Sequence, residues 1–419
     1  MTEKKKFSFS GSSLRAYVMI VVLAAIWIYF HFATYNSTPD FTDIFAHIGS
    51  FFSGIGSAAA ALFTGGEAPN WVMDGIFLTP RNLSNLMQQM SVTAIIAIGM
   101  LMVIVSGNID LSVGSLLGLT GGVAAYCLSS LEFSLPVALL IAIAVGTVIG
   151  AFQGFLTAYL NIPSFIVTLG GLLALRGAVK WLLGGNTIGL SNQTFGQIGN
   201  GNLSVMLGWV LAAAAVAFVL FSAYRHAAAV KIYGLGEPDY KKELLRSIVP
   251  IVGIIAFMAV MNAYQGLPYS VLILLAIALL GAFLTGSTTF GRYLYAIGGN
   301  ADAARLSGIN IKISALKVFA LLGALTAVAS LIYTSRVGSA SPDAGTLKEL
   351  DAIAACVIGG ASLMGGRGTI FGACLGALIM ATLDNGMSLL NVRDFMQDIV
   401  KGSILVAAVG LDMIGRKES

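Results

Sequence analysis

The sequence has few charged side chains. Only 10% of its 419 residues are Asp, Glu, Lys or Arg, whereas 57% are hydrophobic. A soluble globular domain carries roughly 25% charged residues, so this chain has too few polar side chains to cover a water-exposed surface. A mean hydropathy of +0.88 supports the same conclusion. We therefore predict that most of the surface faces lipid.

Cysteine and histidine are also scarce, with three residues of each. The cysteines lie inside apolar stretches without CxxC or Cys/His spacing, so we interpret them as small packing residues. The histidines are isolated from one another and give no metal-ligand pattern. We accordingly expect no metal site, no cofactor and no catalytic residue. The residues concerned are Cys127, Cys356, Cys374, His31, His47 and His226.

Three further functional classes are excluded by what is missing. The net charge is only +4 and the basic residues are spread over several short loops, so no basic face for nucleic acid is visible. The phosphate-binding pattern GxxxxGK[ST] is absent, so the chain does not look able to hydrolyse ATP itself. No HExxH motif or carboxylate pair occurs within an apolar run, which argues against an intramembrane hydrolase.

What the sequence does contain is a series of long apolar runs. In lipid, each backbone N–H and C=O group must be paired within the protein, so these runs are predicted to be helices. They do not alternate apolar and polar residues, as the strands of a membrane β-barrel would. We predict an all-α polytopic membrane protein with about 10–12 transmembrane helices, forming one transmembrane domain over residues 1–419. The runs cover residues 16–33, 84–105, 112–130, 136–159, 164–183, 203–223, 248–265, 269–286, 315–334, 369–390 and 399–415.

Two stretches do not fit a simple span. Residues 351–366 are apolar for only about a dozen positions before a Gly-rich break, which is too short to cross a bilayer. We expect a short broken helix there, buried among other helices. Residues 38–80 are moderately apolar and are interpreted as an extracytoplasmic or interfacial insertion.

The distribution of basic residues predicts the orientation in the membrane. Lys and Arg are enriched in cytoplasmic loops, and the loops at 225–246 and 291–317 are both basic. The amino terminus begins with several lysines, and the carboxyl terminus ends with Arg416 and Lys417. Together with the predicted spans, these positions indicate that both termini are cytoplasmic.

Repeated glycines at four-residue spacing occur within the runs, at 146, 150 and 154 and again at 368, 372 and 376. Such spacing lets the backbones of two helices approach closely. We therefore interpret both repeats mainly as helix-packing surfaces, with a direct role in a transport pathway as the alternative.

One interrupted span carries a polar motif. The stretch SGNIDLSVGS, from Ser106 onward, places Asn108, Asp110, Ser112 and Gly114 between two apolar runs. A carboxylate in this position needs partners, and Ser112 is a candidate cap for the helix that follows. Broken helices beside polar side chains form the substrate sites of many transporters. A simple helix–helix turn, with Asp110 bonded to backbone amides, is an equally good interpretation.

A second motif lies in the basic loop at 287–314. Glycines 298, 299 and 308 bracket a short segment that would form a helix with one apolar stripe. The segment is short and rich in small residues, so docking of a soluble partner is favoured over attachment to the bilayer surface. The stripe would comprise Ala301, Ala303, Ala304, Leu306 and Ile309.

Several motifs together resemble the permease family of ABC-type monosaccharide importers, which includes ribose and xylose permeases. The resemblance runs in order from about residue 80 to the end. It is carried by SGNIDLSVGS, AIGGNADAARLSGINI, LDAIAACVIGGASLMGGRGTIFGACLGALI and LDNGMSLLNV.

The resemblance implies a pore subunit in the bacterial inner membrane that translocates a monosaccharide, with D-xylose or a similar pentose as the expected cargo. It implies a homodimer in the lipid bilayer, two separate ATP-binding subunits and a periplasmic sugar-binding protein. The substrate pathway would involve Asn108, Asp110, Ser112 and Gly114. The contact with the ATPase would involve Gly299, Asn300, Ala303, Ala304, Arg305 and Gly308.

An ion-coupled secondary sugar transporter is the main alternative. Such a protein needs ionisable residues deep in several helices. The candidates are few and most lie near helix ends, which favours an external source of energy. They are Asp110, Arg176, Lys180 and Asp384. Arg176 and Lys180 share a helix face and are expected to reach an interface or form a local ion pair.

Overall fold

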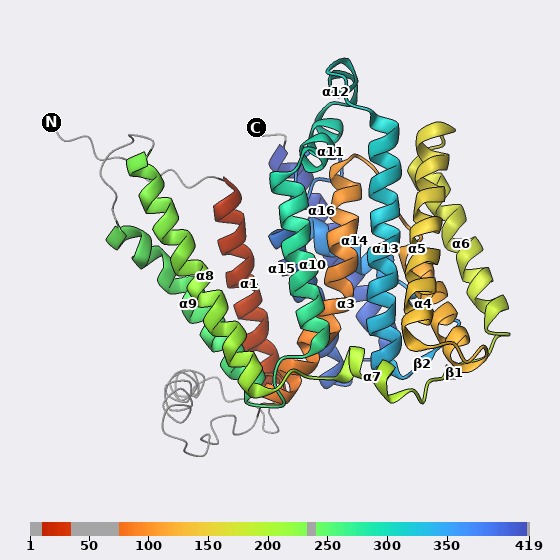
Figure 1. Ribbon diagram of the computed structural model, residues 1–419, viewed down its shortest axis with the longest axis horizontal. Coiled ribbons are helices and arrows are strands. Elements are labelled where there is room, and N and C mark those ends of the chain that lie inside the picture. The colour runs from red at the N-terminus through yellow and green to blue at the C-terminus, as the bar shows by residue number, and fades with distance from the viewer. Residues whose placement is uncertain (1–10, 35–74, 233–239, 417–419) are drawn as a thin grey trace. The chain divides into compact units, whose positions relative to one another are not determined.

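The computed structural model describes residues 11–34, 75–232 and 240–416, and these are almost entirely helical (Figure 1). Their only strands are β1 (Ile188–Gly189) and β2 (Ser339–Ala340), which pair antiparallel. The helices are α1 (Gly11–Ala33), α3 (Pro80–Val105), α4 (Val113–Ser129), α5 (Leu135–Tyr159), α6 (Ser164–Leu182), α7 (Gln193–Asn200), α8 (Val205–Ile232), α9 (Tyr240–Asn262), α10 (Tyr269–Ser287), α11 (Thr289–Gly299), α12 (Ala301–Leu306), α13 (Ile311–Val337), α14 (Lys348–Ile358), α15 (Ile370–Leu389) and α16 (Asp394–Arg416).

The predicted fold class is confirmed, because a helix covers each of the predicted apolar runs. Within the described ranges, eight helices are long and apolar enough to cross a membrane. α4 has 17 residues and is shorter than these eight. The cytoplasmic location of the termini stays a prediction. Residues 38–74 of the predicted insertion lie outside the described residues.

The chain divides into two compact units. Unit 1 comprises residues 1–33, 86–200 and 270–419, and unit 2 comprises residues 34–85 and 201–269. In unit 2, α8 and α9 pack on each other as a helical hairpin. The base of that hairpin is closed by a hydrogen bond of 2.8 Å from Leu203 N to Leu267 O.

In unit 1, α13 packs along α5 through glycines. A Cβ on Gly146 would lie 2.6 Å from the carbonyl oxygen of Gly323, and a Cβ on Gly150 would overlap the carbonyl oxygen of Phe319. The two backbones can therefore touch only because these positions lack side chains. This confirms the interpretation of the first glycine repeat as a packing surface.

The second glycine repeat joins α15 to α14 in the same way. A Cβ on Gly372 would meet the carbonyl oxygen of Gly359, and a Cβ on Gly376 would meet that of Ala355. α15 also contacts α1, where Trp27 Nε1 donates a 3.0 Å hydrogen bond to Thr382 Oγ1. Small or polar residues of α15 therefore form its contacts with both α14 and α1.

The predicted broken helix exists, but its bounds differ from the prediction. It begins at Lys348 rather than at residue 351 and ends at Ile358. The following apolar residues are not helical, because Gly360, Gly365 and Gly366 adopt positive φ angles of 87°, 88° and 71°. Such angles favour glycine and turn the chain back toward the start of α15.

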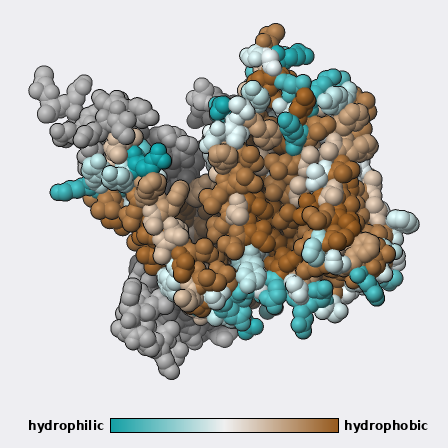
Figure 2. Space-filling view, in the orientation of Figure 1, coloured by the Kyte–Doolittle hydropathy of each residue, from teal (hydrophilic) through white to brown (hydrophobic). Residues whose placement is uncertain are grey.

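Large hydrophobic side chains remain exposed on unit 1, as expected of a surface that meets lipid. Figure 2 shows a hydrophobic band over this unit between two hydrophilic ends. The short helix α12 lies at one of those ends (Figure 1). Examples of exposed apolar side chains are Leu140, Val148, Phe152, Leu173, Trp181, Leu279 and Phe283.

Candidate functional site

The polar turn between α3 and α4 is held together by Asp110. This carboxylate is 1% exposed, and its Oδ1 atom accepts hydrogen bonds of 2.7 Å from both the amide and the hydroxyl of Ser112. The Ser112 hydroxyl also accepts a 2.8 Å bond from Gln153 Nε2 on α5. Ser112 occupies the N-cap position of α4, as predicted, but its hydroxyl makes no capping hydrogen bond to that helix. Asp110 and Gln153 engage it instead.

The preceding part of the turn is attached to α6. Asn108 is half-buried, and its side-chain amide donates to Ser106 Oγ at 3.1 Å. The backbone of Ile109 meets α6 through contacts of 3.4 Å with the hydroxyls of Ser164 and Thr168. The helix–helix turn interpretation therefore describes the local bonding. A role of these residues in the substrate pathway stays a prediction.

Gly114, the fourth predicted pathway residue, lies against the start of α14. A Cβ at this position would overlap the carboxylate of Glu349 and the carbonyl oxygen of Gly345. One turn later, a Cβ on Gly118 would lie 2.6 Å from the carbonyl oxygen of Ala344. The absence of side chains on this face of α4 lets the loop before α14 pack directly on the helix.

Arg176 ties α6 to that same loop. Its Nη1 atom donates hydrogen bonds to the carbonyl oxygens of Pro342, at 3.2 Å, and Ala344, at 2.9 Å. The guanidinium group thus holds backbone carbonyls. The sequence had indicated snorkelling or a local ion pair instead. Arg176 and the glycine face of α4 fix where α14 begins.

Four charged side chains from α14, α15 and α16 form an ion network. Lys348 Nζ lies 2.7 Å from Asp351 Oδ2, and Lys401 Nζ lies 3.0 Å from Asp384 Oδ1. Two cross-links join the pairs, from Lys401 to Asp351 at 3.6 Å and from Lys348 to Asp384 at 3.9 Å. None of the four side chains is more than 25% exposed. Asp398, which is 50% exposed, also lies 4.0 Å from Lys401, so three carboxylates lie close to the two lysines.

Sequence reasoning identified only Asp384 of this network. The missed signal was Lys401, which lies with Asp412 in the apolar run at 399–415, because a charge in such a run needs a partner in the protein interior. Asp398, three residues before Lys401, lies 4.0 Å from it, but Asp351 and Asp384 lie on other helices, and helical spacing does not reveal them.

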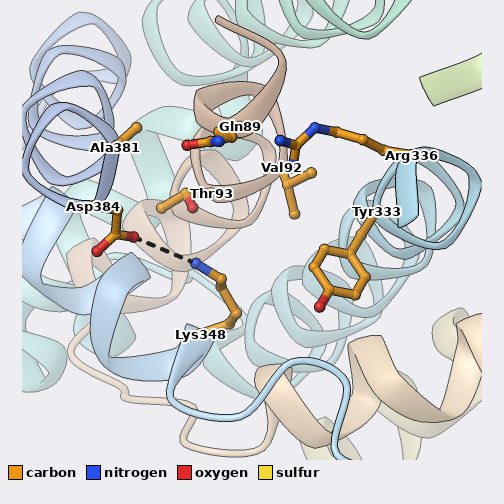
Figure 3. Close-up of a pocket in the computed structure, with 8 residues that line it drawn as sticks. All are labelled: Gln89, Val92, Thr93, Tyr333, Arg336, Lys348, Ala381 and Asp384. Atoms are coloured by element: carbon orange, nitrogen blue, oxygen red, sulfur yellow. Dashed lines mark ion pairs between the residues drawn. The ribbon is translucent and has the colours of Figure 1, made fainter. Parts of the chain in front are cut away.

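A pocket borders the ion network (Figure 3). Its volume is about 140 Å³, room for about five water molecules at ~30 Å³ each. In Figure 3 the side chains of Lys348 and Asp384 point toward one another, and the guanidinium group of Arg336 points toward Gln89 and Val92. The lining comes from α3, α13, α14 and α15, and comprises Gln89, Val92, Thr93, Tyr333, Arg336, Lys348, Ala381 and Asp384.

The predicted docking segment forms α11 and α12. Asn300 caps α12, because its Oδ1 atom accepts a 2.9 Å bond from the amide of Ala303. Arg305 pairs with Asp302 at 2.6 Å, and both side chains are largely exposed. Gly308 turns the chain with a φ of 83°.

The predicted apolar stripe of this segment is presented outward for the most part. Ala304 is buried and Ile309 is partly covered, whereas Leu306 is 89% exposed. Among the predicted ATPase contacts, all except Ala304 are exposed: Gly299, Asn300, Ala303, Arg305 and Gly308. The segment is therefore available to a partner, and its role as an ATPase contact stays a prediction.

Comparison with known proteins places the chain among transport permeases. Residues 82–409 match the family described as the permease component of branched-chain amino acid transport systems. The chain is 48% identical over 350 residues to the xylose transport system permease protein of Haemophilus influenzae, covering 82% of this chain and 92% of that protein. It is 44% identical over 349 residues to the xylose permease of Escherichia coli K12, covering 83% and 89%.

The ribose import permease protein of Escherichia coli K12 is 38% identical over 336 residues, covering 80% of this chain and 87% of that protein. No solved structure matches the chain. These relatives confirm the resemblance to monosaccharide permeases, and with the apolar helices they identify a multi-pass protein of the bacterial inner membrane. The chain belongs to the family of transport-system permease components that its residues 82–409 match.

Proposed function

We propose that this chain is the membrane-spanning permease of an ATP-driven importer that carries a monosaccharide, D-xylose or a similar pentose, across the inner membrane. The observation that carries the proposal is the 44–48% identity to two xylose permeases over most of both chains. The ribose permease, at 38%, is less similar.

The energy source is proposed to lie in separate subunits. The chain has no phosphate-binding loop of its own, and the exposed segment around α12 offers a surface for a soluble ATPase. A periplasmic sugar-binding protein would deliver the cargo, and two copies of the chain would form the pore. The predicted pathway residues would then shape or brace the moving helices rather than hold a sugar tightly. They are Asn108, Asp110, Ser112 and Gly114.

Purification of the tagged chain from its native membrane in a mild detergent tests this assembly. An ATP-binding subunit should co-purify in equal copy number with the permease. The complex is then placed in proteoliposomes without an ion gradient, with ATP inside and with the binding protein and radiolabelled D-xylose outside. Only complexes whose ATPase faces the lumen can use the enclosed ATP, so the measured uptake reports this orientation.

Uptake that needs ATP and survives ionophores is the expected result. Uptake that is lost on dissipating an ion gradient, from a chain recovered without an ATPase, would instead establish the secondary-transporter alternative. Transport of ribose in preference to xylose would keep the importer assignment and change the cargo.

A further inference from the structure

We propose that the pocket between α3, α13, α14 and α15 is a contact site for the neutral sugar on its way through the permease. This inference rests on the proposed function and names the place within the chain where the cargo is held.

The lining has the chemistry that a polyhydroxylated ligand needs. Gln89 offers an amide donor and an acceptor, and Thr93 and Tyr333 offer hydroxyl groups. A sugar also has C–H faces, and the amphipathic ring of Tyr333 can pack against such a face while its hydroxyl remains polar. Val92 and Ala381 supply the small apolar part of the wall.

The ion pair on the pocket wall favours a ligand that does not compete for its charges. Lys348 and Asp384 lie 3.9 Å apart on the wall, both belong to the ion network, and Arg336 adds a second cation to the lining. Asp384 can accept hydrogen bonds from hydroxyl groups, and Lys348 and Arg336 can donate them. A second anion or cation would disturb the pairing of the network, whereas a neutral sugar would not.

The size of the pocket agrees with contact to part of a small sugar. Its volume of about 140 Å³ is room for about five waters at ~30 Å³ each, so one face of a pentose would enter and the rest would remain outside. The lining does not form a closed cage, because most of its polar side chains are only half-buried: Gln89, Tyr333, Arg336, Lys348 and Asp384. This suits a transport site, which must bind its cargo well enough to admit it and weakly enough to release it.

The pocket also lies where movement of helices would change it. Lys348 is the first residue of α14, and the adjacent Glu349 lies against Gly114 of α4. A shift of α4 relative to α14 would therefore move the pocket wall. The polar turn at Asp110 would then affect sugar binding indirectly, through the position of α4 against α14, without contacting the sugar.

Uptake by pocket variants gives the first test. Gln89→Ala and Tyr333→Ala should each lower D-xylose uptake roughly tenfold, the equivalent of one hydrogen bond or ring contact. Gln88→Ala is the matched control, because Gln88 is the neighbouring half-buried glutamine of α3 and does not line the pocket. Permease level in the membrane and ATPase co-purification should be unchanged in all three variants, and Gln88→Ala should also retain full uptake.

Protection of an introduced cysteine from chemical labelling gives a second test, because sugar would not change the labelling rate if the pocket residues had only a structural role. Thr93→Cys is nearly isosteric and places a thiol on the pocket wall, and the unsubstituted chain reports labelling of the native cysteines. In the reconstituted complex during turnover, millimolar D-xylose should slow modification of this thiol by a polar reagent. D-xylonate, which carries a carboxylate, should not.

The outcomes separate the two proposals. If the unsubstituted complex imports D-xylose while both pocket variants import it equally well and xylose leaves labelling unchanged, the pocket is not a sugar site and the importer assignment stands. If xylonate protects as well as xylose, the preference for a neutral ligand is wrong. If the unsubstituted complex imports no monosaccharide, the proposed function fails and the pocket assignment fails with it.

Discussion

Lys348 and Glu349 are consecutive residues that point into two different polar clusters. The ammonium group of Lys348 lies 2.7 Å from Asp351 and 3.9 Å from Asp384, on the pocket side. The carboxylate of Glu349 lies against Gly114 of α4. The first turn of α14 therefore connects the ion network with the polar break between α3 and α4, two features far apart in the sequence.

The ion network should stabilise the folded chain only when it is complete. Lys401→Met leaves Asp351 and Asp384 with Lys348 as their one remaining cation in the network, and should lower the free energy of unfolding by about 3 kcal/mol. Adding Asp384→Leu to Lys401→Met removes the unpaired charge and should recover part of the loss. Unfolding in mixed micelles, followed by circular dichroism, measures both. If Asp384→Leu lowers the free energy of unfolding of the Lys401→Met variant as much as an independent substitution would, the network is contradicted.

Gly114 should tolerate no side chain. Gly114→Ala would force its methyl group into Glu349 and Gly345, and overpacking of this kind costs about 1–3 kcal/mol. Gly170→Ala is the matched control, since Gly170 also lies within a helix and a Cβ there has nothing within 4 Å. Thermal unfolding of the purified proteins compares them. Equal melting temperatures for the two variants would show that α14 can move away from α4 at no cost.

The Asp110 turn should depend on an acceptor at that position rather than on a charge. Asp110→Ala leaves the buried amide and hydroxyl of Ser112 without this acceptor and should cost about 1–3 kcal/mol. Asp110→Asn retains an oxygen and should cost clearly less. If the turn braces the pathway, replacing Asn108, Asp110 and Ser112 together by alanine should also lower sugar uptake at normal membrane levels. Unchanged uptake would remove these residues from the pathway.

Charge reversal on the exposed face of α12 should affect coupling and leave the fold intact. Arg305 is 71% exposed and, among the residues that the structure describes, it pairs with Asp302 alone, on the same helix, so Arg305→Glu removes little from the folded chain. We expect it to lose both ATPase co-purification and uptake, with an unchanged melting temperature. Arg393→Glu, an exposed reversal between α15 and α16, is the control and should retain both. Full coupling in the Arg305 variant would exclude this face as the ATPase contact.

Much of the architecture could be predicted because it depends on local properties of the chain. A run of about 20 apolar residues is sufficient to predict a helix in lipid, because the backbone N–H and C=O groups there must hydrogen-bond to one another. For that reason the eleven predicted runs coincide with helices to within several residues. The glycine repeats likewise indicated close packing, since four-residue spacing places small residues on one face. The segment at 301–308 was predicted as a short exposed helix from its bracketing glycines.

The bonding of the polar residues could not be predicted in the same way. Ser112 had the position and chemistry of a cap, yet Asp110 and Gln153 engage its hydroxyl, and the glutamine comes from another helix. Arg176 was expected to reach an interface or form a local ion pair, yet it binds carbonyl groups more than 160 residues away along the chain. A hydrogen-bonding side chain takes whichever partner the fold brings near it.

The sequence by itself determined that this is a helical membrane protein, where its helices run and which transport family it resembles, because hydrophobicity and motif order are properties of the linear chain. The tertiary structure alone decided that Lys348, Asp351, Asp384 and Lys401 share one network and that α3, α13, α14 and α15 enclose a polar pocket beside it. The physical reason is that burial of a charge is tolerated only where an opposite charge is close, and that proximity is created by helix packing between segments widely separated in sequence.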